Sequence, residues 1–298
     1  MSLPNWLVGF RGQVRTNEIL AQHTTFCIGG AADWFLVPDD AEALAQVYNA
    51  LVKEQVPTFV LGKGSNVLFG DKGFRGAVLS TEKLSAIRLL DGGRILAEAG
   101  AELKDVCAFA LAHGLTGLEF ACGIPGSVGG ALYMNAGAYD GEMSSVVESV
   151  TVLRTDGSIN EISRNDMRFG YRTSLVQCEG GTILAGTIKL QHGEQALIFT
   201  KMDDFNTRRA EKQPLTIPSA GSTFKRPEGH FAGKLIMDAG LRGFSIGGAQ
   251  VSELHCGFVV NKGGATAVDV LALIAHIRQT VHSRFGVWLE PEVRLIGE

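Results

Sequence analysis

The opening third of the chain changes between helical and extended spacing of its apolar residues. One helical face is predicted by apolar residues that recur every three to four positions, namely Leu44, Val47, Tyr48 and Leu51. Asp39 and Glu42 precede this face three residues apart, as the two members of a helix-capping pair do. The apolar runs at residues 34–37 and 58–61 predict strands on either side of the helix. This order indicates a small α/β subdomain.

Extended patterns dominate the middle of the chain. Strands are predicted at residues 77–80, 87–90, 95–98 and 182–191, and a helix is predicted at residues 103–111, ending at Gly114. Residues 147–154 and 158–162 flank Thr155-Asp156-Gly157, which predicts a hairpin turn. Hairpins next to helices favour an α+β fold over a doubly wound parallel sheet.

The last third begins with a change in composition. A very polar helix is predicted at residues 205–212, and Pro214 and Pro218 then break the chain. Thr266 with Asp269 predicts the start of a final helix, and Gly286 predicts its end. The buried stripe of this helix is Val270, Ile274, Ile277, Val281 and Phe285. A final strand is predicted at residues 289–295. We therefore expect a crossing into a smaller α/β domain near residue 195.

Composition narrows the function classes. The 298 residues are 45% hydrophobic and 19% charged with a net charge of −4, as in a folded globular protein without a basic nucleic-acid-binding face. The N-terminus lacks the pattern of a secretory signal, and no apolar run is long enough for a membrane span. Five scattered cysteines without a C-x-x-C pair argue against disulfides and a zinc site. We expect a reduced, cytoplasmic protein without a metal centre.

Glycine is the exceptional residue type, with 38 copies where an average content of ~7% would give roughly 21. One cluster follows the strand at residues 58–61 and reads Gly62-Lys63-Gly64-Ser65-Asn66. Gly64 permits a positive φ, and consecutive N–H groups in such a turn can surround a phosphate. The spacing matches neither a Walker A loop nor Gly-x-Gly-x-x-Gly. Taken alone, the cluster is more often a structural turn than a ligand site.

A second cluster runs from residue 119 to 131 and continues through residues 135–139. Its glycines and alanines leave backbone free to approach a flat or phosphorylated ligand. Close packing of a helix against a strand is the plainer alternative. Because two such loops lie ~60 residues apart, a large dinucleotide is the favoured ligand. The residues assigned to cofactor binding are Gly62, Lys63, Gly64, Ser65, Asn66, Gly123, Pro125, Gly126, Ser127, Gly129, Gly130, Asn135, Ala136 and Gly137.

Six ordered motifs give the chain a family resemblance. Beside the two loops, they are Thr24-Thr25-Phe26 with Gly29-Gly30, Phe169-Gly170-Tyr171-Arg172, the segment at residues 218–227 (PSAGSTFKRP) and the segment at residues 289–294 (LEPEVR). The sequence resembles the UDP-N-acetylenolpyruvoylglucosamine reductases, which belong to the vanillyl-alcohol-oxidase/PCMH-type FAD-binding superfamily. The resemblance implies two FAD-binding α/β subdomains, at residues 1–80 and 81–195, and a C-terminal substrate domain at residues 196–298. It also implies non-covalent FAD, NADPH as co-substrate and UDP-N-acetylglucosamine enolpyruvate as the substrate that is reduced to UDP-N-acetylmuramate.

The resemblance also implies three catalytic residues. Arg172 matches the arginine that binds the substrate carboxylate. The planar guanidinium of arginine suits a bidentate contact with a carboxylate better than a lysine does. Ser222 matches the proton donor, although a lone serine after glycine is usually a turn or cap residue. Glu292, on the last predicted strand, matches the active-site glutamate. Confusion with Glu290 stays open because Pro291 can disturb the alternation of the strand.

Substrate contacts are implied less strongly. Tyr171 adjoins the arginine, and Lys212 matches a lysine near the phosphates of substrate and NADPH, with a solvated lysine as the alternative. Arg226 stands where some relatives have asparagine. His255 fits a substrate contact and a packing histidine equally well. No tyrosine occurs between residues 173 and 221, so the chain resembles the short members that lack a tyrosine-containing substrate loop.

Two other functions remain open. One is an FAD-dependent oxidase of the same superfamily, whose members often tether flavin covalently to His or Cys. Cys122 borders the second loop but is better interpreted as a small packing residue. The other is a flavin-binding module without catalysis, which the presence of all three catalytic residues disfavours. The sequence does not settle oligomeric state, and a monomer is favoured.

Overall fold

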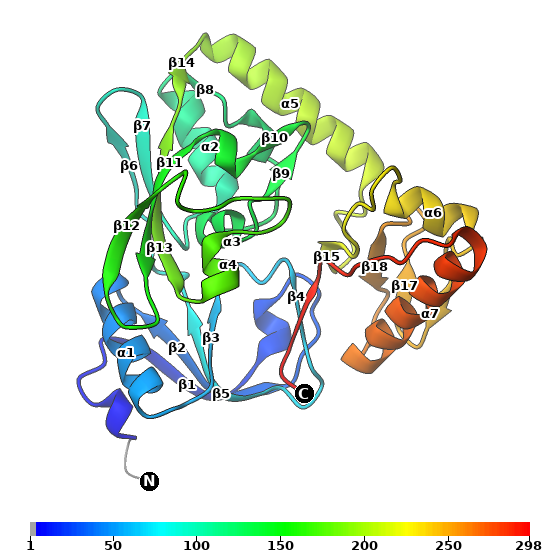
Figure 1. Cartoon of the computed structure of the whole chain (residues 1–298), viewed down its shortest axis with the longest axis horizontal. Coiled ribbons are helices and arrows are strands. Elements are labelled where there is room, and N and C mark those ends of the chain that lie inside the picture. Colours follow the sequence, from blue (N-terminus) through cyan, green and yellow to red (C-terminus); the bar gives the residue numbers. More distant parts are fainter. Residues whose placement is uncertain (1–3) are drawn as a thin grey trace. The chain divides into compact units, whose positions relative to one another are not determined.

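The computed structural model describes residues 4–298 (Figure 1). The chain divides into two units, and each has its own core. Unit 1 comprises Met1–Arg15, Trp34–Lys63 and Gly76–Arg209, and unit 2 comprises Thr16–Asp33, Gly64–Arg75 and Ala210–Glu298. The boundaries fall inside three strands, inside the first glycine loop and near the end of the long helix α5. Residues from both ends of the sequence therefore build unit 2.

One sheet of unit 1 packs against the first α-helix of the chain. Its strand order is β1-β2-β5-β3, with β3 parallel to β5. The strands are β1 (Gly12–Ile19), β2 (Ala31–Pro38), β3 (Thr58–Leu61) and β5 (Phe74–Ser80), and η1 (Asn5–Leu7) precedes them. Helix α1 (Ala41–Lys53) buries Val47 and Leu51 against Leu36 and Leu79. This confirms the predicted strand–helix–strand unit.

The cap of α1 corrects the prediction by one residue. The N-cap is Asp40, whose Oδ1 accepts the N–H of Ala43 at 2.8 Å. Asp39 instead pairs with Lys83 Nζ at 2.6 Å. Two consecutive aspartates made the choice ambiguous, because either can satisfy a first-turn N–H.

The larger sheet of unit 1 is antiparallel, in the order β12-β11-β13-β7-β6. Its strands are β6 (Ile87–Leu90), β7 (Arg94–Glu98), β11 (Val147–Leu153), β12 (Ile159–Ser163) and β13 (Thr182–Lys189). Short pairs are β8 (Leu115–Thr116) with β14 (Gln191–His192), and β9 (Gly137–Ala138) with β10 (Gly141–Glu142). The hairpin around residues 155–157 is confirmed, and so is the α+β class.

Helices of unit 1 bury the apolar face of this sheet. They are α2 (Leu103–Ala112), α3 (Val128–Tyr133), α4 (Leu175–Glu179) and α5 (Gln195–Lys212), with the short turns η3 (Glu119–Ala121) and η4 (Met143–Ser145). Val106 of α2 and Leu132 of α3 join Val150 and Ile188 in one core. Helix α5 begins ten residues before the predicted start at residue 205. Ile198, Met202 and Phe205 face the core, but the exposed Leu197 and Phe199 on either side of Ile198 obscure this apolar face in the sequence.

Unit 2 is built on the antiparallel sheet β15-β18-β17-β16. Its elements are η2 (Leu20–His23), β4 (Val67–Phe69), β15 (Ser219–Ser222), α6 (Ala232–Asp238), β16 (Ser245–Ile246), β17 (Ala249–Val251), β18 (Phe258–Asn261), α7 (Ala267–Phe285) and β19 (Arg294–Ile296). Helices α6 and α7 pack on the sheet through Ile236 and Ile277 (Figure 1). Thr266 and Asp269 form the predicted capping box of α7, and Gly286 ends it at φ 72°.

The final strand is shorter than predicted. β19 begins at Arg294 and pairs in parallel with β4, whereas residues 289–293 lie outside it. Pro291 lacks an N–H, so the chain cannot keep a regular ladder through this residue. Glu292 thus precedes the last strand instead of lying on it.

Candidate active site

The first glycine loop leaves β3 through Gly62 and Lys63 of unit 1. A Cβ on Gly62 would lie 2.3 Å from Ser127 Oγ, so this loop touches the second loop only because residue 62 has no side chain. Lys63 Nζ lies 2.5 Å from Glu102 Oε1, and this bond lowers the pKa of the Glu102 carboxyl. The lysine charge is therefore neutralised by Glu102, and the backbone N–H groups are what the loop offers to a phosphate.

The second loop of unit 1 ends in helix α3. Ser127 is the N-cap, and the next two N–H groups donate to the carbonyls of Ala101 and Ala99 at 2.9 and 2.8 Å. A Cβ on Gly129 would lie 2.9 Å from Ala99 Cβ, so tight packing against β7 is the reason for this glycine. A Cβ on Gly130 would come no closer than 3.6 Å to its surroundings. Close packing of helix against strand therefore explains the glycine at residue 129, but it does not explain the glycine at residue 130.

The rest of the first loop belongs to unit 2. Gly64 has a φ of 65°, and a Cβ there would lie 2.1 Å from the carbonyl oxygen of His23, so glycine is required. The Gly64 carbonyl accepts the N–H of Thr25, from the Thr24-Thr25-Phe26 motif, at 3.1 Å. Ser65 is half-buried, and Asn66 Nδ2 donates to the Glu292 carbonyl at 3.2 Å. The first loop thus also supports a predicted catalytic residue.

Arg172 lies in a tight turn of unit 1. Gly170 and Thr173 exchange two backbone hydrogen bonds, of 3.2 and 3.3 Å. Arg172 is the third residue of this turn and has a φ of 58°, a position where type II turns favour glycine. An L-residue in this region costs about 1–2 kcal/mol. Such strain persists only where the surroundings enforce it, and it is typical of functional sites.

Contacts of the Arg172 guanidinium keep it close to the second loop. Its Nη2 donates to the Gly137 carbonyl at 3.3 Å, and its carbon lies 5.2 Å from the centre of the Tyr171 ring. Arg172 is half-buried, whereas the Tyr171 side chain is exposed. A half-buried guanidinium can bind a carboxylate with less competition from water than a fully exposed one.

Ser222 and Glu292 lie on adjoining segments of unit 2. Glu292 N–H donates to the Thr223 carbonyl at 2.8 Å, so the backbone places Glu292 directly beside the serine motif. Thr223 is buried and its Oγ1 accepts the N–H of Val259 at 2.9 Å. Because side chains alternate along an extended segment, Ser222 faces away from this buried contact and is exposed.

The two neighbouring glutamates have different surroundings. Glu290 is exposed and pairs with Lys225 Nζ at 2.6 Å. Glu292 is half-buried, between the backbone of Thr223 and the side chain of Asn66. Glu292 is therefore the better candidate for an active-site acid. Arg172 belongs to unit 1, and Ser222 and Glu292 belong to unit 2.

Three predicted substrate residues belong to unit 2, and their side chains differ in exposure and in the contacts that they make. Lys212 is exposed at the end of α5. The Arg226 guanidinium lies 4.0 Å from the centre of the exposed Phe231 ring. His255 Nδ1 accepts the N–H of Gly257 at 3.1 Å, and burial lowers the pKa of its imidazole. Burial therefore favours the neutral form of this hydrogen-bonded ring.

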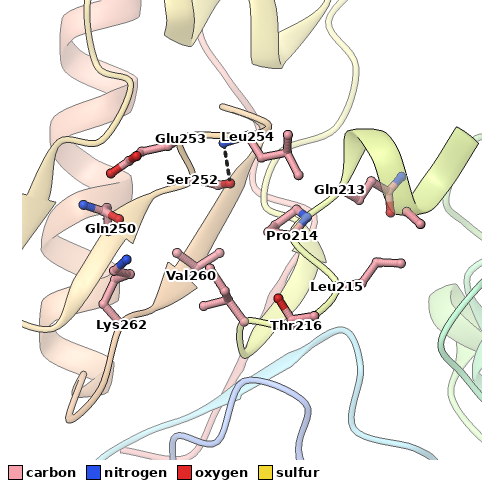
Figure 2. Close-up of a pocket in the computed structure, with 12 residues that line it drawn as sticks. Gln213, Pro214, Leu215, Thr216, Gln250, Ser252, Glu253, Leu254, Val260 and Lys262 are labelled. Carbon is pink, nitrogen blue, oxygen red and sulfur yellow. Dashed lines mark hydrogen bonds between the residues drawn. The ribbon is translucent and has the colours of Figure 1, made fainter.

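A cavity of about 420 Å³ opens in unit 2 beside two of these residues (Figure 2). On one side it is lined by the loop after α5, from Gln213 to Ile217. Gln250, Ser252 and Glu253 line the other side, together with Lys262. None of the predicted substrate residues lines the cavity, although Lys212 and His255 lie next to it along the chain. No sequence motif indicates this cavity, because its polar residues come from separate segments.

Cys122 bears on covalent flavin attachment. The thiol is buried, its Sγ lies 3.3 Å from Asn206 Oδ1, and burial raises its pKa. A thiol with a raised pKa is a weak nucleophile. These surroundings agree with a packing residue.

Among residues 4–298 no group of three His, Cys, Asp or Glu side chains could hold a metal ion. In the same residues no helix is both long and apolar enough to cross a membrane.

Comparisons with known proteins cover both parts of the chain. The family model "FAD binding domain" matches residues 32–163, and "UDP-N-acetylenolpyruvoylglucosamine reductase, C-terminal domain" matches residues 213–296. The UDP-N-acetylenolpyruvoylglucosamine reductase of Clostridium botulinum (strain Eklund 17B / Type B) is 50% identical over 286 residues, which are 96% of this chain and 94% of that protein. The chain belongs to the UDP-N-acetylenolpyruvoylglucosamine reductase family. The reductase of Caldanaerobacter subterraneus subsp. tengcongensis is likewise 50% identical over 289 residues, with coverage of 96% and 95%.

A solved structure supports the same assignment. The reductase from Thermus caldophilus superimposes with a TM-score of 0.82 at 33% identity, over 96% of this chain and 99% of that one. The predicted family and fold are thereby confirmed, and FAD is the cofactor of this reductase. Within unit 1, Gly62 of the first loop lies against Ser127 of the second, so these parts of the two loops are in contact.

Proposed function

We propose that the chain reduces UDP-N-acetylglucosamine enolpyruvate to UDP-N-acetylmuramate with NADPH, in peptidoglycan precursor synthesis. The observation that carries this proposal is family membership over 96% of the chain, in a sequence that holds Arg172, Ser222 and Glu292. Relatives of this name act as reductases, and the three side chains supply the charge and proton chemistry that the reduction needs.

The chemistry of the reduction sets these requirements. Addition of a hydride to the β-carbon of the enolpyruvyl group moves negative charge onto the α-carbon and the carboxylate. A cation must stabilise this charge, and an acid must protonate the α-carbon. When bound, FAD accepts a hydride from NADPH and supplies it to the substrate.

Arg172 is proposed to bind the substrate carboxylate. A guanidinium offers two parallel N–H donors to the two carboxylate oxygens, and it stays charged at every relevant pH. The strained turn supports the proposal, because a glycine would fit the same backbone at lower energy. A function that needs the guanidinium explains why an arginine is tolerated there.

Ser222 is proposed to deliver the proton to the α-carbon. It is exposed at the end of β15, so its hydroxyl is accessible to a substrate. Glu292, held beside Thr223, is proposed to stabilise or relay charge at the reacting carbons. The adjoining backbone of the two motifs supports a shared role.

The other predicted residues are proposed to bind the nucleotide sugar, NADPH and FAD. Lys212, Arg226, His255 and Tyr171 contact the nucleotide sugar or NADPH, and the cavity next to Lys212 and His255 accepts part of it. Its volume of about 420 Å³ lies within the range of small-molecule sites, ~300–1,000 Å³. FAD is bound without a covalent link by the two glycine loops. We also propose a monomer, a cytoplasmic location and the short form without a tyrosine loop.

The variant Ser222→Ala tests the proton donor. Flavin bleaching by NADPH should keep its wild-type rate within about twofold, whereas reoxidation by the enolpyruvyl substrate should slow by ~10²–10⁴-fold, the usual contribution of an acid catalyst. Ser245→Ala, in an exposed position of the same unit, is the matched control and should change neither rate. Wild-type reoxidation in Ser222→Ala would show that another group donates the proton.

A further inference from the structure

Asn135 is a buried polar residue at the end of α3, with a side chain only 1% exposed. Its Nδ2 donates to the Gly170 carbonyl at 3.0 Å, and its Oδ1 accepts the N–H of Ser144 at 2.9 Å. One partner is an acceptor and the other a donor, so the amide orientation is fixed by its surroundings. The backbone at Asn135 has a φ of 43°, which asparagine tolerates better than most residues. The side-chain amide of Asn135 therefore joins two backbone groups within unit 1.

The partner of Asn135 is the first residue of the turn that carries Arg172. The Gly170 carbonyl accepts from Thr173 N–H at 3.3 Å as well as from Asn135. A carbonyl oxygen has two lone pairs, so both bonds can form together. Asn135 thus anchors the turn just ahead of the strained residue.

A second side chain anchors the turn from the other end. Ser174, two residues after Arg172, is fully buried, and its Oγ donates to the Tyr133 carbonyl at 2.8 Å. Arg172 Nη2 itself reaches the Gly137 carbonyl at 3.3 Å. Three hydrogen bonds therefore join residues 133–137 to residues 170–174, on both sides of Arg172 and at Arg172 itself.

We propose that Asn135 is a positioning residue for Arg172, which holds the guanidinium in the orientation that receives the substrate carboxylate. This inference rests on the proposed function of Arg172. A single L-residue at positive φ relaxes unless the surrounding chain is fixed, and here the bond from Asn135 holds Gly170, two residues before Arg172, while the bond from Ser174 holds the chain two residues after it. The segment after α3 thereby aligns the arginine with the second glycine loop.

Asn135→Asp is the test variant, because it keeps the shape, the tolerance for positive φ and the acceptor for Ser144. It removes only the donor to Gly170 and sets a carboxylate oxygen against that carbonyl. In the FAD-loaded enzyme, calorimetric titration with UDP-N-acetylglucosamine enolpyruvate under oxidised conditions should show a Kd about tenfold higher, the scale of one lost charge-assisted contact. Asn17→Asp, at an exposed asparagine with a φ of 53°, is the matched control and should leave the Kd unchanged.

A double-mutant cycle separates positioning from general weakening of the fold. In an Arg172→Ala background, Asn135→Asp should change the Kd less than twofold, because the guanidinium it positions is gone. Equal effects with and without Arg172 would overturn the inference, as would an unchanged Kd in Asn135→Asp. If Arg172→Ala alone leaves the Kd unchanged, the proposed role of Arg172 fails instead. Should Asn135→Asp not fold, Ser174→Ala tests the other anchor with the same titration and the same expected loss.

Discussion

Replacing Arg172 by glycine should lower kcat/KM for the enolpyruvyl substrate by ~10²–10³-fold without lowering stability by more than about 1 kcal/mol. Glycine at a φ of 58° relieves about 1–2 kcal/mol of strain. Against this, the variant loses the hydrogen bond to Gly137 and the contact with Tyr171, together about 1–2 kcal/mol. Glycine also costs about 0.5–1 kcal/mol of additional chain entropy on folding. These contributions nearly cancel.

Arg172→Ala separates strain from contacts, because it loses the same contacts but keeps a Cβ at positive φ. It should therefore be less stable than Arg172→Gly by about 0.5–1 kcal/mol, or ~1–3 °C in Tm. Both variants should lose ~10²–10³-fold in kcat/KM for the enolpyruvyl substrate, as when a charge-stabilising donor is removed. The assays are thermal unfolding followed by circular dichroism, and steady-state kinetics.

Two results would refute this reasoning. If Arg172→Ala is as stable as Arg172→Gly, the backbone at residue 172 is not strained in solution. If either variant keeps wild-type kcat/KM, the guanidinium does not bind the carboxylate that becomes charged during the reaction.

Two further predictions concern stability. Glu119 is 2% exposed, and its carboxylate accepts hydrogen bonds from Thr116 Oγ1 at 2.5 Å and from Gly117 N–H at 3.0 Å. Burial raises the pKa of this carboxyl, but the hydrogen bonds outweigh burial and lower the pKa overall. Glu119→Gln should thus cost about 1.5–3 kcal/mol at pH 7 in urea unfolding. Because the folded pKa is lowered, this stabilisation is full above the ordinary pKa of glutamate, about 4.3, and is lost as pH falls through the folded value; a gap between variants that stays constant below pH 4 contradicts it. Asp71 accepts the N–H groups of Ala267 and Val268, in the first turn of α7, at 2.7 and 3.1 Å. Asp71→Ala should therefore lower the free energy of unfolding by about 1 kcal/mol. An unchanged urea midpoint would show that water replaces the carboxylate.

Local patterns predicted the elements whose signals are contained in one short segment. The capping box of α7 and its glycine stop are examples, because side chain and backbone partners lie within three residues. The start of α5 was missed since the exposed Leu197 and Phe199 disturb its helical pattern. The cap of α1 was misplaced by one residue between two aspartates.

Long-range pairing was beyond the reach of these patterns. Glu292 was placed on a strand, but its backbone pairs with Thr223, almost seventy positions earlier. The resemblance supplied Arg172, yet nothing in the sequence indicates its positive φ, since arginine is an unfavourable residue there. The anchoring bonds of Asn135 and Ser174 likewise join segments about 35–40 residues apart.

The central claim is that this chain passes reducing equivalents from NADPH to an enolpyruvyl nucleotide sugar. The most direct measurement is the visible absorbance band of the oxidised flavin, followed under anaerobic conditions. Addition of NADPH should bleach the band, and subsequent addition of UDP-N-acetylglucosamine enolpyruvate should restore it with formation of one equivalent of UDP-N-acetylmuramate. Bleaching without recovery, or recovery only when oxygen is admitted, would contradict the account and indicate a flavoprotein with another acceptor.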